Sequence, residues 1–195
     1  KRIIFSGNGY SEEWQKEAAR RGLPNLPTMV DAIPALTTDK SVNMFEQFKV
    51  FSKAELESRA EIQYEIYAKA INIEAKTMID MATKQIIPAV IRYTTVLADS
   101  INSVKNAGSF DVSAQEQILG KTSSLLAATN VALNNLKSLT SQIEVKEEGV
   151  ERARYCLDVI MPAMTELREP VDKLEMLVDK EMWPMPSYGD LIFII

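Results

Sequence analysis

The sequence contains no histidine and a single cysteine, Cys156. Without histidine, the chain lacks the side chain that most often serves as a general base and as a transition-metal ligand. A single cysteine excludes an intramolecular disulfide and a cysteine-rich zinc site. If the chain belongs to an enzyme, its chemistry would therefore use carboxylates, arginines and bound cations, or lie elsewhere. We interpret Cys156, which lies in a helical pattern, as a buried structural thiol in preference to a reactive one.

The chain also lacks a long apolar run and an excess of positive charge. No run of about 18 apolar residues is present, so we expect no membrane span. A net charge of -5 and a pI near 5.0 argue against a nucleic-acid partner. With 195 residues, 46% of them hydrophobic and 25% charged, the composition is that of a globular protein. We expect a cytoplasmic location, and since the first residue is Lys1 we expect part of a longer protein.

The N-terminal quarter of the chain predicts an irregular connector with short helices. Residues 3–5 are a short strand candidate. Ser11 is the expected N-cap of a helix that stops at Gly22. Two more short helices are expected, one before Pro34 and one around residues 42–51.

A long helical signal runs from residue 52 to about residue 107. Its apolar residues recur in steps of three and four, at Met78, Ala82, Ile86, Ala89, Tyr93, Leu97, Ile101 and Val104. Pro88 lies inside this pattern and is expected to kink the helix or divide it in two. Gly108 is expected to end the helix.

A second long helix is predicted after Gly108. Ser113 and Glu116 have the spacing of a capping box, in which each side chain binds the backbone N–H of the other residue. The residues expected to face the core are Ile118, Leu125, Ala132, Leu136, Leu139 and Ile143. The opposite face is rich in Ser, Thr and Asn, and we expect it to lie in water.

The third long helix has the most regular pattern. Its apolar residues alternate steps of three and four, at Val150, Ala153, Leu157, Ile160, Met164, Leu167, Val171, Leu174 and Val178. This 3.5-residue period predicts the seam of a left-handed antiparallel bundle or coiled coil. Pro162 and Pro170 interrupt the pattern, so we expect a bent helix. The short break near Gly149 predicts an antiparallel hairpin with the second long helix.

The stretch "WPMPSYGDLIFII" closes the chain and is predicted to be extended, because two prolines and a glycine disfavour a helix. We expect "LIFII" to pair or pack with "RIIF" at the other terminus. The sequence thus predicts an all-α fold, an up-down bundle of long, proline-kinked helices with an irregular N-terminal connector and short β-like ends. One structural domain is expected, made of a connector (1–51), a bundle (52–182) and a tail (183–195) packed on the N-terminal segment.

The turn "SGNGYSEEW" before the first helix raises the question of a phosphate site. Gly7 and Gly9 supply two glycines of the G-x-G-x-x-G frame, but Glu12 takes the third position. Glu12 and Glu13 also occupy the positive helix end that a phosphate would need. We therefore favour a tight turn leading into a capped helix over a nucleotide site.

The carboxylates give no evident metal site or acid–base pair. Glu74 and Asp80 are six residues apart and do not share a helix face. Glu147, Glu148 and Glu151 cluster at the start of the third long helix, where negative charge suits the helix dipole. We favour a solvated helix start over a metal site there. No catalytic, cofactor-binding or metal-binding residue is assigned, and the residues alone favour an interaction or assembly role.

Four stretches carry a family resemblance: "KRIIFSGNGYSEEWQKEAARRGLPNLPT", "INIEAKTMIDMATKQIIPAVIRYT", "VIMPAMTELREPVDKLEMLV" and "WPMPSYGDLIFI". The specific elements are the "GNGYS.EW" turn, the "IN-EA-TM-D" helix start, "IIPAV" and the terminal "WP-P-YGDL-F" string. Together, in this order, they resemble the C-terminal part of type III glutamine synthetases over essentially the whole chain. Ser6 departs from the family, where asparagine is expected.

The resemblance implies a parent ligase that makes glutamine from glutamate, ammonia and ATP with Mg²⁺ or Mn²⁺, through a γ-glutamyl phosphate. It also implies a homo-oligomer of stacked hexameric rings. The family's metal-binding glutamates, catalytic arginines and ATP contacts would lie upstream of Lys1, and no residue here matches them. The expected partners are the parent catalytic domain and neighbouring subunits, with neither nucleic acid nor membrane.

Three roles for the chain itself follow as hypotheses. The first is a non-catalytic domain, inactive alone, that supports the oligomer or the outer wall of the catalytic barrel. The second is a regulatory docking module that binds an inhibitor protein or effector. The third is a free-standing helical scaffold unrelated to any enzyme.

Overall fold

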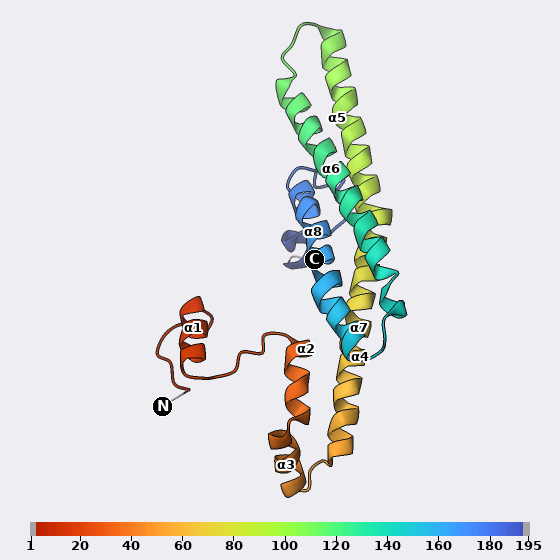
Figure 1. Ribbon diagram of the computed structural model, residues 1–195. Coiled ribbons are helices and arrows are strands. Elements are labelled where there is room, and N and C mark those ends of the chain that lie inside the picture. The colour runs from red at the N-terminus through yellow and green to blue at the C-terminus, as the bar shows by residue number, and fades with distance from the viewer. Residues whose placement is uncertain (1–2, 193–195) are drawn as a thin grey trace. The chain divides into compact units, whose positions relative to one another are not determined.

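The computed structural model describes residues 3–192, and within that range the chain folds into helices joined by turns (Figure 1). No strand occurs among those residues, so the predicted all-α class is confirmed. The chain divides into two compact units, with the boundary between Tyr67 and Ala68 inside a long helix. We call these the N-terminal and the C-terminal unit. The expected segments 1–51, 52–182 and 183–195 stay a prediction.

The N-terminal unit contains short helices that begin at capping hydroxyl groups. Its elements are α1 (Glu12–Arg20), α2 (Met29–Ala32), the 3₁₀ helix η1 (Ile33–Thr37), α3 (Asp39–Gln47) and the first part of α4 (Lys53–Met81). Ser11, Thr28 and Thr38 precede α1, α2 and α3, and each side chain accepts the backbone N–H of the third residue on. The predicted cap at Ser11 is confirmed.

Helices α1 and α3 end in the same hydrogen-bonding motif. Gly22, with a φ of 65°, follows α1, and the N–H of Leu23 reaches back to the carbonyl of Ala18 at 2.9 Å. After α3, Lys49 takes the glycine position with a φ of 54°, and the N–H of Val50 donates to the carbonyl of Phe45 at 2.9 Å. The predicted stop at Gly22 is confirmed. The helix expected around residues 42–51 starts and ends earlier, because the chain turns at Lys49.

The C-terminal unit is built on long helices. Its elements are the rest of α4, the π-helical segment η2 (Ala82–Ile86), α5 (Ile87–Ala107), α6 (Ser113–Thr140), the 3₁₀ helix η3 (Ile143–Val145), α7 (Val150–Tyr155), the π-helical segment η4 (Cys156–Ile160), α8 (Met161–Glu175) and α9 (Tyr188–Ile192). In Figure 1, α5 and α6 lie side by side with opposite directions, and α8 packs along α6. This is the predicted up-down arrangement.

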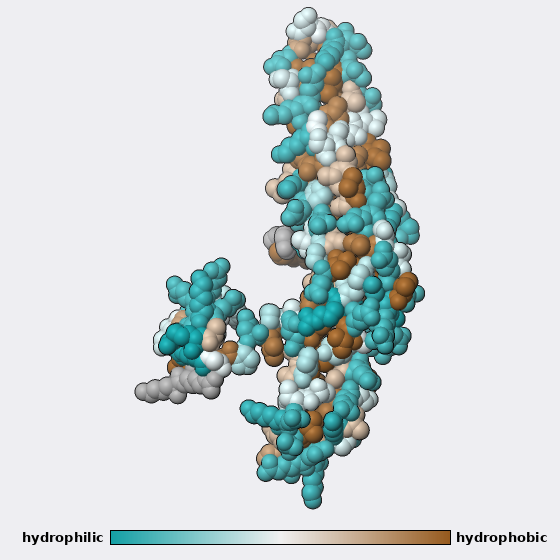
Figure 2. All heavy atoms as spheres, viewed as in Figure 1, coloured by the Kyte–Doolittle hydropathy of each residue, from teal (hydrophilic) through white to brown (hydrophobic). Residues whose placement is uncertain are grey.

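A buried apolar cluster holds α5 and α8 together. Ile86 and Val90 pack there with Leu174 and Val178, and Trp183 covers the cluster from the segment after α8. Figure 2 shows that hydrophilic side chains dominate the visible surface, with hydrophobic ones between them. The apolar residues predicted along 78–104 are all buried or half-buried, as expected.

Two prolines follow π-helical segments rather than ending the helices. Pro88 and Pro162 each lie two residues after such a segment. The residue before each proline, Ile87 or Met161, donates its N–H to the carbonyl five residues back. The wider turn relieves the steric clash between the proline ring and the carbonyl of the preceding turn. Because proline has no N–H, no backbone donor is left unpaired at its position. The kinks expected at these prolines stay a prediction. The π-helical segments before them were not predicted from the sequence.

The buried face of α6 matches the predicted one in part: Leu136 and Ile143 are buried, and Leu125, Ala132 and Leu139 are half-buried. Its buried residues are Thr122, Thr129, Leu133, Leu136 and Thr140, followed by Ile143. Ile118, predicted to face the core, is exposed. The expectation that the threonines lie in water is therefore wrong for three of them, because their positions face the neighbouring helices and a methyl group packs there.

The buried face of the third long helix is wider than one seam. Ala153, Ile160, Leu167, Leu174 and Val178 are buried as predicted. Cys156, Ala163 and Pro170 are buried as well, whereas Val150 is exposed and Leu157, Met164 and Val171 are half-buried. Small side chains lie where neighbouring helices approach closely, and the larger ones flank them.

Two further expectations are corrected. Ser113 and Glu116 form no capping box, because Asp111 accepts the N–H of Ser113 and Glu116 pairs with Lys105 at 2.6 Å. The chain ends are not β-like where described: residues 3–5 form no strand, and residues 188–192 are helical. Pairing of "RIIF" with "LIFII" stays a prediction, and residues 1–2 and 193–195 lie outside the described range.

Candidate functional surfaces

The glycine turn before α1 is closed by its own hydrogen bonds. The Asn8 side chain accepts the N–H of Tyr10 at 3.0 Å, and the Asn8 carbonyl accepts the hydroxyl of Ser11 at 2.8 Å. The same hydroxyl accepts the N–H of Trp14 at 3.4 Å. Glu12 and Glu13 occupy the first turn. The helix start is thus capped and carries negative charge, which makes it unfavourable for a phosphate.

Gly7 has a steric role in this turn. A Cβ atom at Gly7 would lie 2.7 Å from the ring of Phe5. That ring stacks on Trp14, with 4.7 Å between the ring centroids and 30° between the planes. The guanidinium of Arg21 lies 5.6 Å from the Trp14 ring centroid on the same helix. Gly7 therefore allows Phe5 to fold back over the helix.

A carboxylate–guanidinium network fixes the N-terminal segment to α1. Glu17 binds Arg20 at 2.6 Å and Arg21 at 2.7 Å. Arg21 also donates to the carbonyl of Ile4 at 2.6 Å. Hydrogen bonds from Arg20 and then Arg21 lower the pKa of Glu17 to about 2. The network makes α1 and residues 3–5 one local structure.

A hollow of about 460 Å³ lies beside Trp14 in this local structure. Its walls include Ile3, Ala18, Leu23 and Pro24. The polar side chains of Gln15 and Asn25 line it as well, and Ile3 and Ile4 are exposed. Such a surface can accept an apolar side chain and offers little to a charged ligand.

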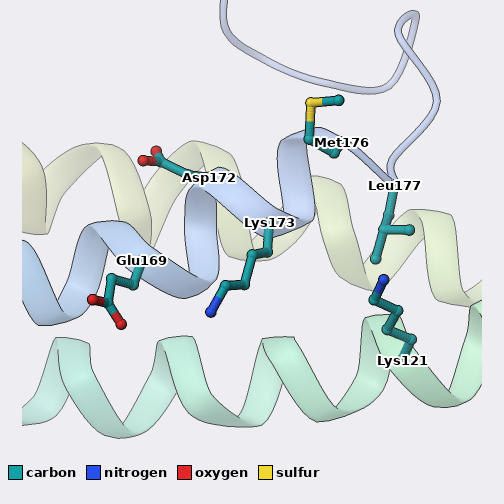
Figure 3. A pocket seen from close by; sticks show the side chains of 6 residues that line it. All are labelled: Lys121, Glu169, Asp172, Lys173, Met176 and Leu177. Atoms are coloured by element: carbon teal, nitrogen blue, oxygen red, sulfur yellow. The ribbon is translucent and has the colours of Figure 1, made fainter.

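A second open groove lies between α6 and α8 (Figure 3). It has a volume of about 470 Å³ and is lined by Lys121, Glu169, Asp172, Lys173, Met176 and Leu177. Figure 3 shows Lys121 on α6 facing the turn that follows α8, while Asp172 points away from α6. Asp172 is paired with Arg168 at 3.1 Å. The groove is open and its charged side chains have both signs, so they do not converge on one position where a ligand of one charge could bind. The sequence analysis missed this groove because apolar periodicity indicates only which helix faces are buried.

The carboxylates weighed in the sequence lie apart in the structure. Glu74 is exposed on α4, and Asp80 pairs with Lys84. Glu148 pairs with Arg152 at 3.3 Å at the start of α7. Among residues 3–192, no group of three His, Cys, Asp or Glu side chains lies close enough to hold a metal ion. The assignment of no site residue stays a prediction.

Cys156 lies inside the C-terminal unit. The thiol is fully buried at the start of η4, as the sequence predicted. Burial raises its pKa, which keeps the thiol protonated and unreactive. Over the described part of the chain, no helix combines the length and apolar character that crossing a membrane requires.

Comparison with known proteins identifies the family. A family model described as the glutamine synthetase C-terminal domain matches residues 1–105. A glutamine synthetase of Butyrivibrio fibrisolvens is 37% identical over 196 residues, covering 99% of this chain and 28% of the relative. The type-3 glutamine synthetase of Dictyostelium discoideum is 32% identical (99% and 27%), and a glutamine synthetase of Bacteroides fragilis is 30% identical (98% and 27%).

The chain spans little more than a quarter of the length of these curated relatives. Its own length, in contrast, is matched almost completely in each of them. The resemblance to the C-terminal part of type III glutamine synthetases is confirmed. The chain belongs to the glutamine synthetase C-terminal domain family.

Proposed function

We propose that this chain is the C-terminal part of a glutamine synthetase and that its own role is to support the oligomer. The parent enzyme would be a ligase that joins ammonia to glutamate with ATP. One observation carries this proposal: the chain aligns over 98–99% of its length with a quarter of three glutamine synthetases. The match is to one contiguous part of each enzyme and includes the "GNGYS" and "YGDL" ends.

The described residues do not fit the divalent metal that the family's chemistry uses. Carboxylates hold Mg²⁺ or Mn²⁺ when several converge, but Asp80, Glu148 and Asp172 each pair with a neighbouring cation. Glu147, Glu148 and Glu151 lie at the start of α7, and no metal-sized group forms there in the described range. We therefore derive no catalytic step from these residues and assign ATP and metal to the rest of the proposed enzyme.

The support role is favoured by the packing and the surface of the C-terminal unit. The buried faces of α5, α6 and α8 pack together in a helical bundle. Outside it, Val131 and Met176 are 70% and 84% exposed, on α6 and directly after α8. Apolar side chains at such positions are candidates for contacts with a neighbouring subunit.

The test uses the full-length protein encoded by the gene. Full-length protein should form glutamine, and Val131→Asp with Met176→Asp should lower its assembled mass in analytical ultracentrifugation. Ser123→Asp, on the exposed part of α6, is the matched control and should leave the mass unchanged. An unchanged mass in the double variant would contradict the support role. A full-length protein without synthetase activity would contradict the enzyme assignment.

A further inference from the structure

The local structure around α1 buries little apolar surface. Only Ala18 of α1 is buried, and the ring pair of Phe5 and Trp14 remains half-buried. A stable core needs far more buried apolar surface than one short helix supplies. Yet the segment carries five ordered interactions, two of them aromatic or cation–π. The segment is ordered but has no core of its own. This combination indicates that another surface packs against it and buries its apolar side chains.

Several large apolar side chains of this segment are exposed. Tyr10 is 98% exposed and Ile4 is 64% exposed, and Ile3 and Leu26 are exposed as well. The hollow beside Trp14 lies between Ile3 and Pro24. We refer to the half-buried Trp14 and the exposed Ile3, Ile4, Tyr10 and Leu26 together as the Trp14 face.

We propose that the Trp14 face is the docking surface for the polypeptide that precedes residue 1 in the same chain. This inference rests on the proposed function, in which the matched quarter follows a much longer upstream region. The relatives are matched over only 27–28% of their length, so most of each polypeptide lies outside the region described here. Ile3 and Ile4 belong to the Trp14 face and are also the first described residues after that junction.

Part of the charge on α1 is paired within the segment. Glu17 forms ion pairs with Arg20 and Arg21. Arg21 also donates a hydrogen bond to the carbonyl of Ile4. These three charged groups therefore pair within the segment, whereas Glu12, Glu13 and Lys16 are exposed on α1. The upstream partner surface should be apolar, with a side chain that enters the hollow beside Trp14.

Hydroxyl-radical footprinting of the wild-type full-length protein tests the inference without any substitution. Tyr10 and Ile4 should lose their oxidation in the native protein and regain it when the protein is denatured. Full oxidation of both residues in the native state would overturn the inference. Because this measurement is independent of enzymatic activity, an active enzyme with an oxidised Trp14 face would refute the docking surface and leave the proposed function standing.

Photo-crosslinking identifies the occupant. With a photo-reactive phenylalanine in place of Tyr10, the full-length protein should give a cross-linked product of monomer mass, joined to a peptide upstream of residue 1. A product of dimer mass would show that a second copy covers the Trp14 face and would overturn the inference. Absence of any cross-link would likewise count against it.

A pair of charge substitutions measures the contribution of the surface. Ile4→Asp should lower the thermal midpoint of the full-length protein, because the side chain is exposed in the region described here and would meet only the upstream partner. Val145→Asp is the matched control, at a position that is 83% exposed in the C-terminal unit, and should leave the midpoint unchanged. Equal midpoints for the two variants would overturn the inference.

Discussion

The Cys156 thiol donates a hydrogen bond to the carbonyl of Ala68, with 3.9 Å between the sulfur and oxygen atoms. The contact joins η4 to α4 within the C-terminal unit, whose first residue is Ala68. Because burial raises the pKa of the thiol, it disfavours the thiolate that alkylating reagents attack.

Cys156 should therefore react with iodoacetamide only when the C-terminal unit opens. Intact-mass measurement should show an unmodified protein in native buffer at neutral pH and complete single modification in denaturant. Since Cys156 is the single cysteine of the chain, the mass change reports this residue alone. Rapid modification in native buffer would show that the thiol is accessible, contrary to this prediction.

Thr122→Val should stabilise the protein by about 1 kcal/mol, because a buried hydroxyl without a partner costs free energy that a methyl group of the same shape does not. The Thr122 side chain is fully buried, and its hydroxyl has no hydrogen-bond partner among the described residues. Thr129→Val is the control, because the Thr129 hydroxyl donates to the carbonyl of Leu125 at 2.9 Å. Chemical denaturation should give a smaller gain for Thr129→Val, and equal gains would contradict the interpretation.

Leu174→Ala should destabilise the C-terminal unit by about 2–5 kcal/mol, the range for cavities left by buried leucines. Leu174 is fully buried among Ile86, Val90 and Val178. Its neighbour Glu175 is exposed, so Glu175→Ala should change the free energy of unfolding by less than about 0.5 kcal/mol. Urea denaturation followed by circular dichroism measures both, and a small loss for Leu174→Ala would show that the cluster contributes little.

Lys49→Gly should stabilise the N-terminal unit by about 0.5–1 kcal/mol, because glycine adopts a left-handed conformation without the steric penalty of a Cβ atom. Lys49 has a φ of 54° at the end of α3. Lys49→Ala keeps the Cβ atom and should be neutral. Gly22, with a φ of 65°, provides the reverse change: Gly22→Ala should be destabilising. Thermal denaturation of the three variants should give this order, and a loss of stability in Lys49→Gly would refute the explanation.

Acidification should weaken the network around Glu17. Its folded pKa of about 2 lies below the ordinary value of 4.5, so ionised Glu17 stabilises α1 fully above pH 4.5. That contribution is lost as the pH falls from 4.5 toward 2. NMR titration of the Glu17 carboxyl carbon should give a midpoint near 2, with the α1 amide signals changing in the same window.

Glu17→Gln is the control for this titration. It should remove the pH dependence of the signals around Arg20 and Arg21 between pH 4.5 and 2, because the glutamine side chain does not ionise in that window. A Glu17 midpoint at the ordinary value would show that the ion pairs with Arg20 and Arg21 do not form in solution.

The sequence predicted the long helices well because their apolar residues are large and regularly spaced. Along 78–104, every predicted core residue is buried or half-buried. The faces of α6 and α8 were only partly predicted, because Thr122, Thr140, Ala163 and Pro170 carry little hydropathy signal although they are buried. Burial there is decided by how closely neighbouring helices approach, which periodicity does not report.

Helix starts show the same limit of local reasoning. Ser187 and Asp190 form a reciprocal cap, with 2.7 Å between the Ser187 nitrogen and the Asp190 carboxylate, and start α9 despite the nearby prolines. Ser113 and Glu116 have the same kind of spacing but form no cap, because Asp111 and Lys105 compete for their groups. A capping pattern therefore predicts a helix start only where no other partner is in reach.

The features around α1 were predicted only in part. Ser11 and the acidic first turn were evident from the sequence, and they explain why the turn does not suit phosphate. The hollow beside Trp14 was missed, because its walls bring Ile3 into contact range of Leu23 and Pro24, which lie far along the sequence. No local pattern marks that contact.

The π-helical segments before Pro88 and Pro162 have a consequence for the length of related chains. Each holds one more residue per turn than an α-helix, so it is equivalent to an insertion of one residue within a helix. A relative that has lost one residue from 82–86 or 156–160 would keep its helices in register, but it would then have an ordinary turn against the proline ring. Loss of the residue and loss of the proline should therefore occur together in the evolution of this family.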